Sequence, residues 1–79
     1  MKRSKTLYSI TAWIWNRWNE YEPQTVFSDE DQEKAKAAFA AMHLHGDMPA
    51  IELYRCEIST EDEIAWHVDR RTFLDRRDY

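Results

Sequence analysis

The segment from Leu7 to Trp18, LYSITAWIWNRW, constrains the fold most strongly, because it is apolar on both faces of a strand. Successive strand residues point to opposite faces of a sheet. One face then holds Tyr8, Ile10, Ala12 and Ile14, and the other holds Ser9, Thr11, Trp13 and Trp15. A half-exposed strand alternates apolar with polar side chains, so the two indoles opposite the isoleucines require a second layer, another subunit or a binding partner.

The length of 79 residues predicts a single small domain with a thin core. An aromatic fraction of 14% suits such a core, since aromatic side chains bury a large area per ordered residue. The single cysteine, Cys56, cannot form an internal disulfide, which favours a reducing, cytoplasmic location. We expect neither a signal peptide nor a membrane anchor, because no apolar run approaches the length that spans a bilayer.

The net charge of −4 is unevenly distributed along the chain. The first nineteen residues carry four bases and no acids, whereas the stretch from Glu20 to Glu63 carries twelve acids and three bases. An acidic field of this kind opposes binding to nucleic-acid phosphates and favours a basic protein partner. Solubility alone is the competing explanation for such an acidic surface.

The first half of the chain predicts one strand and one helix. The strand runs from Thr6 to Trp15, and Asn16 to Gln24 forms a connection. Thr25 to Phe27 either adds a short edge pairing or packs as a hydrophobic staple before a helix that Ser28 caps. The helix runs from Asp29 to His45, with acids in its first turn and Gly46 as an αL C-cap. Its core-facing stripe consists of Ala35, Ala38, Phe39, Met42 and His45.

Two further strands are expected after the helix. Ala50 to Ile58 alternates, but both of its faces carry apolar residues, so the pattern does not decide which face meets the helix. Ile64 to Asp69 forms the next strand and directs its even-numbered residues to the core. From about residue 70 the chain is expected to form a terminal turn anchored by Phe73 or a frayed end.

These elements predict a single small α+β domain over residues 1–79 with the element order β-α-β-β. The expected sheet is three-stranded and antiparallel, with the order 1-3-2 and one helix packed on one face. The short connection from Ile58 to Ile64 suits a hairpin, which places the third strand between the other two. A single helix covers one side of the sheet and leaves the side of Trp13 and Trp15 open.

Residue types that carry chemistry are present without the spacing that the chemistry needs. His43 and His45 are two positions apart, so on a helix they cannot point to one metal ion. The single glycine excludes a phosphate-cradling loop and a dinucleotide-binding fingerprint. Cys56 lies within a strand and reads as a structural thiol. We therefore predict a protein that is not an enzyme and has no catalytic residues, no metal and no cofactor.

The tryptophans allow more than one surface interpretation. Together with nearby basic residues they resemble a stacking platform for single-stranded nucleic acid, but the acidic total charge argues against direct nucleic-acid binding. The face of Trp13 and Trp15 is either covered by the tail at Phe73 and Leu74 or by the connection after Trp18, or it is an open interface.

In size, acidity and lack of a catalytic motif, the chain resembles the small inhibitors that phages and mobile elements carry, including anti-CRISPR proteins. This resemblance of class rests on composition alone, and no motif of a particular family is present. It implies a non-catalytic protein that blocks a basic nucleic-acid-binding surface of a defence or nucleic-acid-processing effector. The predicted partner-binding residues are Trp13, Trp15, Trp18, Glu30, Asp31, Glu61 and Asp62. The alternative is a structural or regulatory protein that forms a homodimer through its aromatic sheet face.

Overall fold

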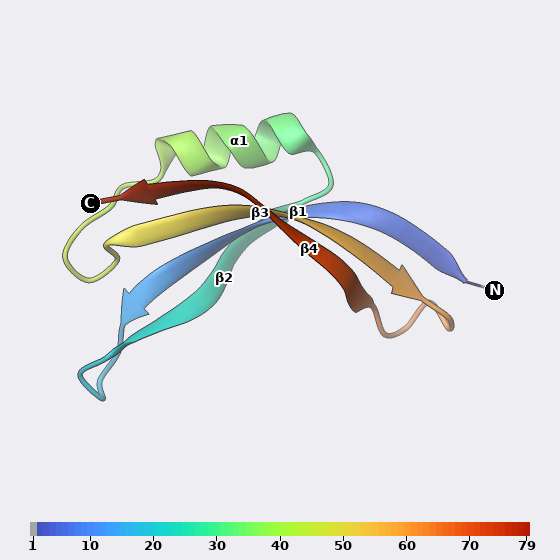
Figure 1. The fold of residues 1–79 in the computed structure, drawn as a ribbon, viewed down its shortest axis with the longest axis horizontal. Coiled ribbons are helices and arrows are strands. Elements are labelled where there is room, and N and C mark those ends of the chain that lie inside the picture. Colours follow the sequence, from blue (N-terminus) through green and yellow to red (C-terminus); the bar gives the residue numbers. More distant parts are fainter. Residues whose placement is uncertain (1) are drawn as a thin grey trace.

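The apolar first strand lies inside a four-stranded antiparallel sheet, and within residues 2–79 this sheet carries one helix on one face (Figure 1). The computed structural model describes residues 2–79. Its elements are β1 (Arg3–Trp15), β2 (Tyr21–Asp29), α1 (Gln32–Ala41), β3 (Ala50–Thr60) and β4 (His67–Asp78). The strands cross near the centre of Figure 1 and fan out towards both ends, as in a strongly twisted sheet. The predicted α+β class is therefore confirmed.

The sheet has the order β2-β1-β3-β4, so the predicted three-stranded sheet of order 1-3-2 is wrong in detail. β1 is antiparallel to both β2 and β3, which therefore run parallel to each other, with α1 connecting them across β1. The pairs Ile10 with Leu53 and Ala12 with Ile51 bring the apolar residues of the two central strands together beneath the helix. Burial of this apolar surface favours β3 beside β1, and the last strand becomes an edge strand.

β2 corrects the prediction that residues 16–24 form only a connection. Trp15 pairs with Tyr21 and Ile10 pairs with Phe27, so the chain folds back on β1 directly after a short turn. The pairing proposed for Thr25 to Phe27 is thus part of a longer strand. Ser28 lies within this strand, and the helix N-cap is Asp31, whose carboxylate accepts hydrogen bonds from the backbone N–H groups of residues 33 and 34.

The helix is shorter than the predicted range of Asp29 to His45 at both ends. It ends at Ala41, and Met42 already has an extended backbone with φ −67° and ψ 131°. Gly46 has no positive φ and does not cap the helix. Residues 42–44 instead have no regular secondary structure, and Met42 and Leu44 pack against the edge of the core. Within residues 2–79, no helix is both long and apolar enough to cross a membrane.

The last strand begins later and runs further than the sequence pattern predicts. Ile64 and Trp66 belong to the β3–β4 loop and are exposed, not directed to the core. Residues 67–78, including the tail expected to form a turn or to fray, pair with β3. Register shifts at Leu53/Tyr54 and Glu57/Ile58 break the alternation along this pair, which is why the period of two did not reveal the strand.

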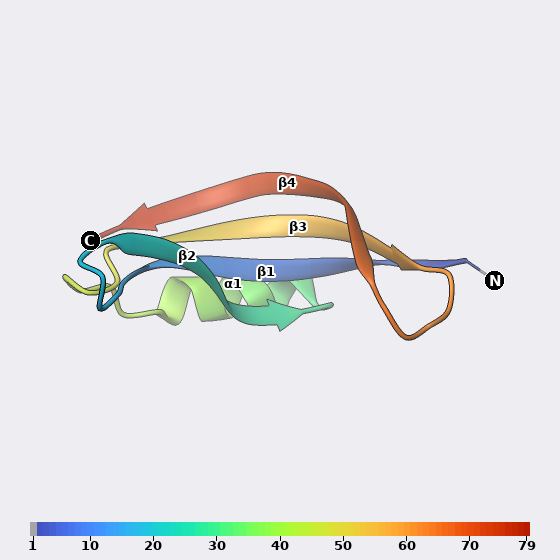
Figure 2. The ribbon, with the colours of Figure 1, turned by 90° about the horizontal axis from the view of Figure 1, so that it is seen from below.

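The core lies between α1 and the two central strands. Its buried members are Ile10, Ala12, Ala35, Phe39, Ile51 and Leu53. The predicted helix stripe is confirmed at Ala35 and Phe39, whereas His45 lies beyond the helix and is exposed. The face of β3 that meets the helix is the one with Ile51 and Leu53. In Figure 2 the helix runs beside β1 and β2, and β4 lies on the far side of β3.

Arg77 links the edge strand β4 to the end of the helix. Its Nη1 atom donates hydrogen bonds to the backbone carbonyl oxygens of Phe39 and Met42, the latter at 3.0 Å. Carbonyls at a helix C-terminus lack partners within the helix and carry the negative end of its dipole, so the guanidinium stabilises this end of α1.

Replacing Arg77 with glutamine is expected to lower the free energy of unfolding by about 1–2 kcal/mol, because two charge-assisted hydrogen bonds to half-buried carbonyls are lost. Arg76→Gln is the matched control, since the Arg76 side chain stays 44% exposed in its ion pairs with Glu52 and Asp78 on the other face of β4, and ion pairs at the surface are worth about 0–1 kcal/mol. Urea unfolding followed by circular dichroism measures both variants. Equal losses in the two variants would contradict the capping role of Arg77.

Candidate functional site

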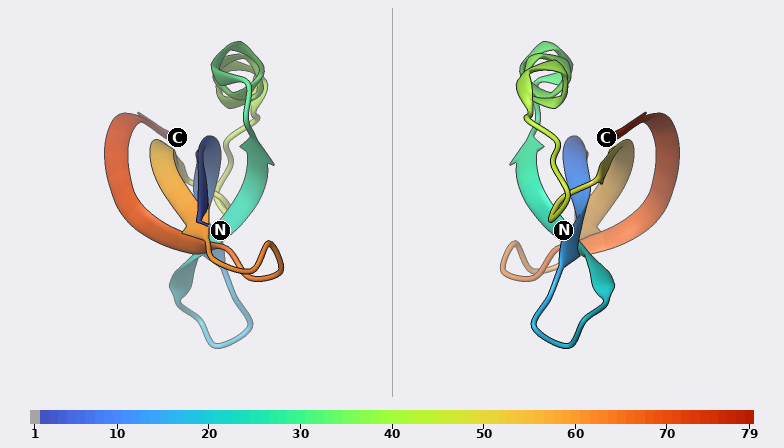
Figure 3. Two further views of the ribbon diagram at one scale, coloured as in Figure 1. Left: turned by 90° about the vertical axis from the view of Figure 1, so that its right-hand side faces the viewer. Right: turned by 90° about the vertical axis from the view of Figure 1, so that its left-hand side faces the viewer.

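The sheet face opposite the helix is hollow and its centre is buried. Ser9 and Thr11 of β1 and Cys56 and Ile58 of β3 all lie on this face and are buried, although no helix covers them. Side chains from all four strands line one groove here. Figure 3 looks along the long axis of the molecule and shows β4 bowed in an arc beside β3. The sheet face that was predicted to be open is therefore partly enclosed by the edge strands β2 and β4.

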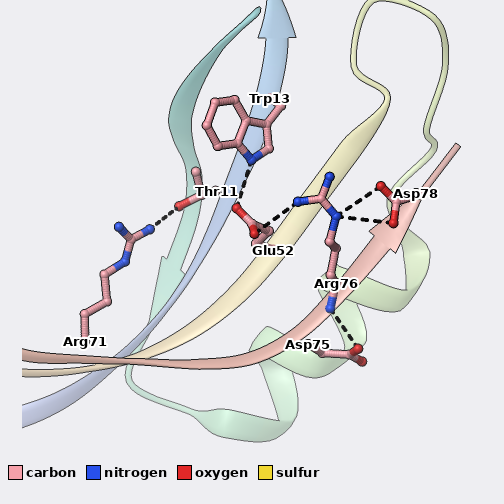
Figure 4. A network of polar contacts seen from close by, with 7 residues as sticks. All are labelled: Thr11, Trp13, Glu52, Arg71, Asp75, Arg76 and Asp78. Atoms are coloured by element: carbon pink, nitrogen blue, oxygen red, sulfur yellow. Dashed lines mark hydrogen bonds and ion pairs between the residues drawn. The ribbon is translucent and has the colours of Figure 1, made fainter.

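Trp13 belongs to a polar network on this face (Figure 4). Its indole Nε1 donates a hydrogen bond of 2.8 Å to Glu52 on β3. The other carboxylate oxygen of Glu52 pairs with Arg76 on β4 at 3.2 Å, and Arg76 also pairs with Asp78. Trp13 is half-buried by these contacts, so its polar edge is already satisfied within the chain.

A second arginine crosses the same face (Figure 4). Arg71 extends from β4 over β3, where its guanidinium lies 3.6 Å from the ring centroid of Tyr54. It reaches β1 and donates a hydrogen bond of 2.9 Å to the hydroxyl of Thr11. Burial and the nearby Glu52 carboxylate raise the pKa of Tyr54, so its hydroxyl stays protonated to a higher pH than an ordinary tyrosine hydroxyl. The face thus holds two fixed guanidinium groups, of which Arg76 is paired with carboxylates.

The turn between β1 and β2, residues 16–20, displays aromatic residues at one end of the sheet. Asn16 organises this turn, since its side-chain Oδ1 accepts hydrogen bonds from the backbone N–H groups of Trp18 and Glu20 at 2.8 and 3.2 Å. The turn places Trp18 at its apex with 71% of its surface exposed. Arg17 lies over the Trp18 ring at 5.2 Å. We call Trp15, Trp18 and Tyr21 the aromatic tip.

The remaining contacts of the aromatic tip fix its base. The rings of Trp15 and Tyr21 meet edge to face with 4.5 Å between their centroids. The Tyr21 hydroxyl donates a hydrogen bond to the carbonyl of Gly46, and the Trp15 backbone N–H donates to the carbonyl of Asp47. These two hydrogen bonds to the segment after the helix therefore stabilise the β1–β2 hairpin. Trp15 and Tyr21 pack on each other, and Trp18 projects into solvent.

The four predicted partner-binding acids do not join the tryptophans. Glu30 pairs with Lys5 at 2.9 Å, and Asp31 caps the helix. Glu61 and Asp62 lie in the β3–β4 loop, at the opposite end of the long axis from the aromatic tip (Figure 1). Hydrogen bonds from the backbone N–H groups after Asp62 hold the pKa of its carboxyl below the usual value, which marks it as a loop-ordering residue.

Three other acids lie beside the aromatic tip and were not singled out from the sequence. Glu20 and Glu22 flank Tyr21 in the chain, and Asp47 is held against Trp15 through its carbonyl. All three are exposed. In the sequence, acidic and aromatic residues lie close together from Trp18 to Glu22. This pattern is typical of a polar connection, and it indicates a surface site only when the pairing of Tyr21 and Glu22 with β1 is known.

Among residues 2–79, no group of three or more His, Cys, Asp and Glu side chains is arranged to hold a metal ion. The arrangement of the aromatic tip suits recognition of another molecule by burial of an indole within an acidic rim. No family model, curated protein or solved structure matches the chain.

Proposed function

We propose that this chain is a non-catalytic protein-binding module whose aromatic tip binds a basic protein partner. The observation that carries this proposal is the exposure of Trp18 on a turn that Asn16 holds in place. A large indole exposed to water gains free energy when a partner buries it, and tryptophan is among the residues most enriched at the energetic centres of interfaces.

The order of the turn adds to the affinity that Trp18 can supply. Binding loses free energy when loops and side chains have to be ordered. Asn16 has already fixed the backbone of the turn, and the Trp15–Tyr21 pair fixes its base. The indole is therefore presented in a defined position before the partner arrives, which reduces this loss.

The acidic residues around the tip favour a basic partner. Glu20, Glu22 and Asp47 are exposed at the aromatic tip, where Arg17 over the Trp18 ring is the neighbouring base, and the chain carries a net charge of −4. Charged groups at the rim of an interface mainly raise the association rate and select partners of opposite sign. These three acids suit this role better than Glu30 and Asp31, which are engaged within the chain.

The class of partner that this chemistry fits is a protein with a basic nucleic-acid-binding surface. We propose that the chain competes with nucleic acid there, by covering the surface and by presenting carboxylates to its arginines. Small acidic inhibitors of the anti-CRISPR kind, carried by phages and mobile elements, act in the manner that this proposal describes. It places the protein in the cytoplasm, where the buried free thiol of Cys56 stays reduced.

Replacing Trp18 with alanine is expected to weaken partner binding at least about thirtyfold with little change in the melting temperature, because the indole makes few contacts within the chain. The partner is first isolated by pull-down from the native host and identified by mass spectrometry. The dissociation constants of wild type and variant are then measured with the purified partner, together with displacement of its nucleic acid.

Trp66→Ala is the matched control, because this exposed tryptophan belongs to the β3–β4 loop, which lies at the other end of the sheet. The proposal is wrong if Trp18→Ala binds and displaces nucleic acid as well as wild type, or if both tryptophan variants lose affinity equally. Light scattering of the wild type separates this function from self-association, since a homodimer closed through the aromatic face has twice the mass of the chain.

A further inference from the structure

The groove on the sheet face opposite α1 is separate from the aromatic tip. It has a volume of about 400 Å³, which is within the range of small-molecule sites. Its lining consists of Leu7, Ser9, Thr11, Pro23, Thr25, Ser28, Cys56, Ile58, Val68 and Arg71. The central strands β1 and β3 supply a buried floor, and the edge strands β2 and β4 supply the walls.

The charge of the groove is opposite to that of the protein. Arg71 is the one charged side chain among the described residues that line it, in a chain with a net charge of −4. Within residues 2–79, the Arg71 guanidinium forms no ion pair with a carboxylate, whereas Arg3, Lys5 and Arg76 all do. A cation beside apolar side chains without an ion-pair partner attracts an anion.

The guanidinium is also held in position. It stacks on Tyr54 and donates to Thr11, and these contacts use one face and one nitrogen of the group. A guanidinium carries five N–H donors in a planar fork, so donors remain for a ligand. Because the position is fixed before binding, an anion placed against it loses little additional free energy to ordering.

The rest of the lining selects an apolar ligand. Leu7, Ile58 and Val68 present hydrocarbon surface next to Arg71. The hydroxyl groups of Ser9, Thr11, Thr25 and Ser28 also belong to the lining, and those of Ser9 and Thr11 already have partners in Cys56 and Arg71. One cation with an apolar surface suits a monoanion that carries a hydrocarbon chain, and it does not suit a polyanion such as nucleic acid, which needs several cations.

We propose that this groove binds a small amphipathic carboxylate, of the chemical class of medium-chain fatty acids. The carboxylate accepts hydrogen bonds from the free N–H groups of Arg71. The hydrocarbon chain lies along Leu7, Ile58 and Val68 and displaces water from the groove.

A chain-length series tests the groove with the whole protein. Acetate, hexanoate, octanoate and decanoate are titrated by calorimetry below their micelle concentrations. We expect no measurable binding of acetate and a gain of roughly fourfold in affinity per added methylene group, as burial of a methylene group predicts. 1-Octanol is expected to bind at least about tenfold more weakly than octanoate, because it lacks the charge.

Arg71→Gln is expected to reduce octanoate affinity at least about tenfold. Arg70→Gln is the matched control, since it removes the same charge from the neighbouring residue, which does not line the groove. Arg71→Lys retains the charge and is expected to keep part of the affinity, and far-ultraviolet circular dichroism confirms that each variant is folded. The proposal is overturned if octanoate does not bind at millimolar concentration, if 1-octanol binds equally well, if Arg71→Gln binds like wild type, or if both glutamine variants lose the same affinity.

Discussion

Replacing Ala35 with glutamate is expected to prevent stable folding. Ala35 has 0% of its surface exposed and lies in α1 against the buried residues of β1 and β3. A carboxylate at this position would lose its hydration among the apolar side chains of the core cluster. The penalty for an unpaired buried charge is several kcal/mol. A small domain has a total stability of roughly 5–15 kcal/mol, so most of it would be lost.

Ala37→Glu is the matched control for this prediction, because Ala37 lies on the exposed side of the same helix. Both substitutions add one negative charge and have the same helix propensity, and Ala37→Glu is expected to change stability by no more than about 0.5 kcal/mol. Circular dichroism and urea unfolding measure both variants. Similar unfolding curves for the two would show that α1 does not dock on the sheet through Ala35.

Replacing Ile51 with alanine is expected to lower the free energy of unfolding by about 2–5 kcal/mol. Ile51 is fully buried in β3, where it pairs with Ala12 and packs in the cluster beneath the helix. The shorter side chain loses apolar contacts and leaves a cavity that a thin core cannot fill. A loss of 2 kcal/mol corresponds to a decrease of roughly 8–16 °C in the melting temperature of a domain of this size.

Ile64→Ala provides the comparison for Ile51. Ile64 lies in the β3–β4 loop with 86% of its surface exposed, so its truncation is expected to change stability by no more than about 0.5 kcal/mol. Thermal unfolding of both variants tests the two positions directly. If Ile64→Ala were the more destabilising, the loop would have to pack as the core strand that the sequence pattern predicted.

The central parts of the fold could be predicted because their patterns are local and regular. β1 is rich in β-branched and aromatic residues without Gly or Pro, and Ala35 and Phe39 repeat at helical spacing. The buried face of β3 could not be assigned, since Ile51 and Leu53 on one face compete with Cys56 and Ile58 on the other. Both faces are in fact buried, one by the helix and one by the curvature of the sheet.

The edge strands could not be predicted from local patterns. β2 contains Pro23 and several acids, and β4 is rich in Asp and Arg. Such residues are typical of edges, where one side of the backbone has no partner strand and charge discourages further pairing. The hydrogen bonds that make these segments strands come from β1 and β3. The partner strand is close in the sequence in both hairpins, but its register is not known from the sequence. The two edge strands can therefore be recognised only when the register of their pairing is known.

The candidate site was predicted in part. Trp18 was among the expected binding residues, and its exposure agrees with that role without testing it. Three of the four acids expected to join it act within the chain: Asp31 as a helix cap, Glu30 in an ion pair and Asp62 as a loop anchor. A residue list cannot distinguish a carboxylate that serves its own backbone from one that is free for a partner, because both appear as acids in polar stretches.

The pairing of β1 with β3 determines the order in which the molecule can assemble. Hairpins β1–β2 and β3–β4 each join neighbouring segments through short turns and can form on the microsecond timescale of local structure. The seam between them pairs Trp13 with Ala50 and Arg3 with Thr60, so it closes a loop that includes β2 and the helix. This closure loses chain entropy before the core residues on its two sides meet. We therefore expect closure of this seam to limit the rate of folding, and until it closes both hairpins expose strand edges that the finished sheet conceals.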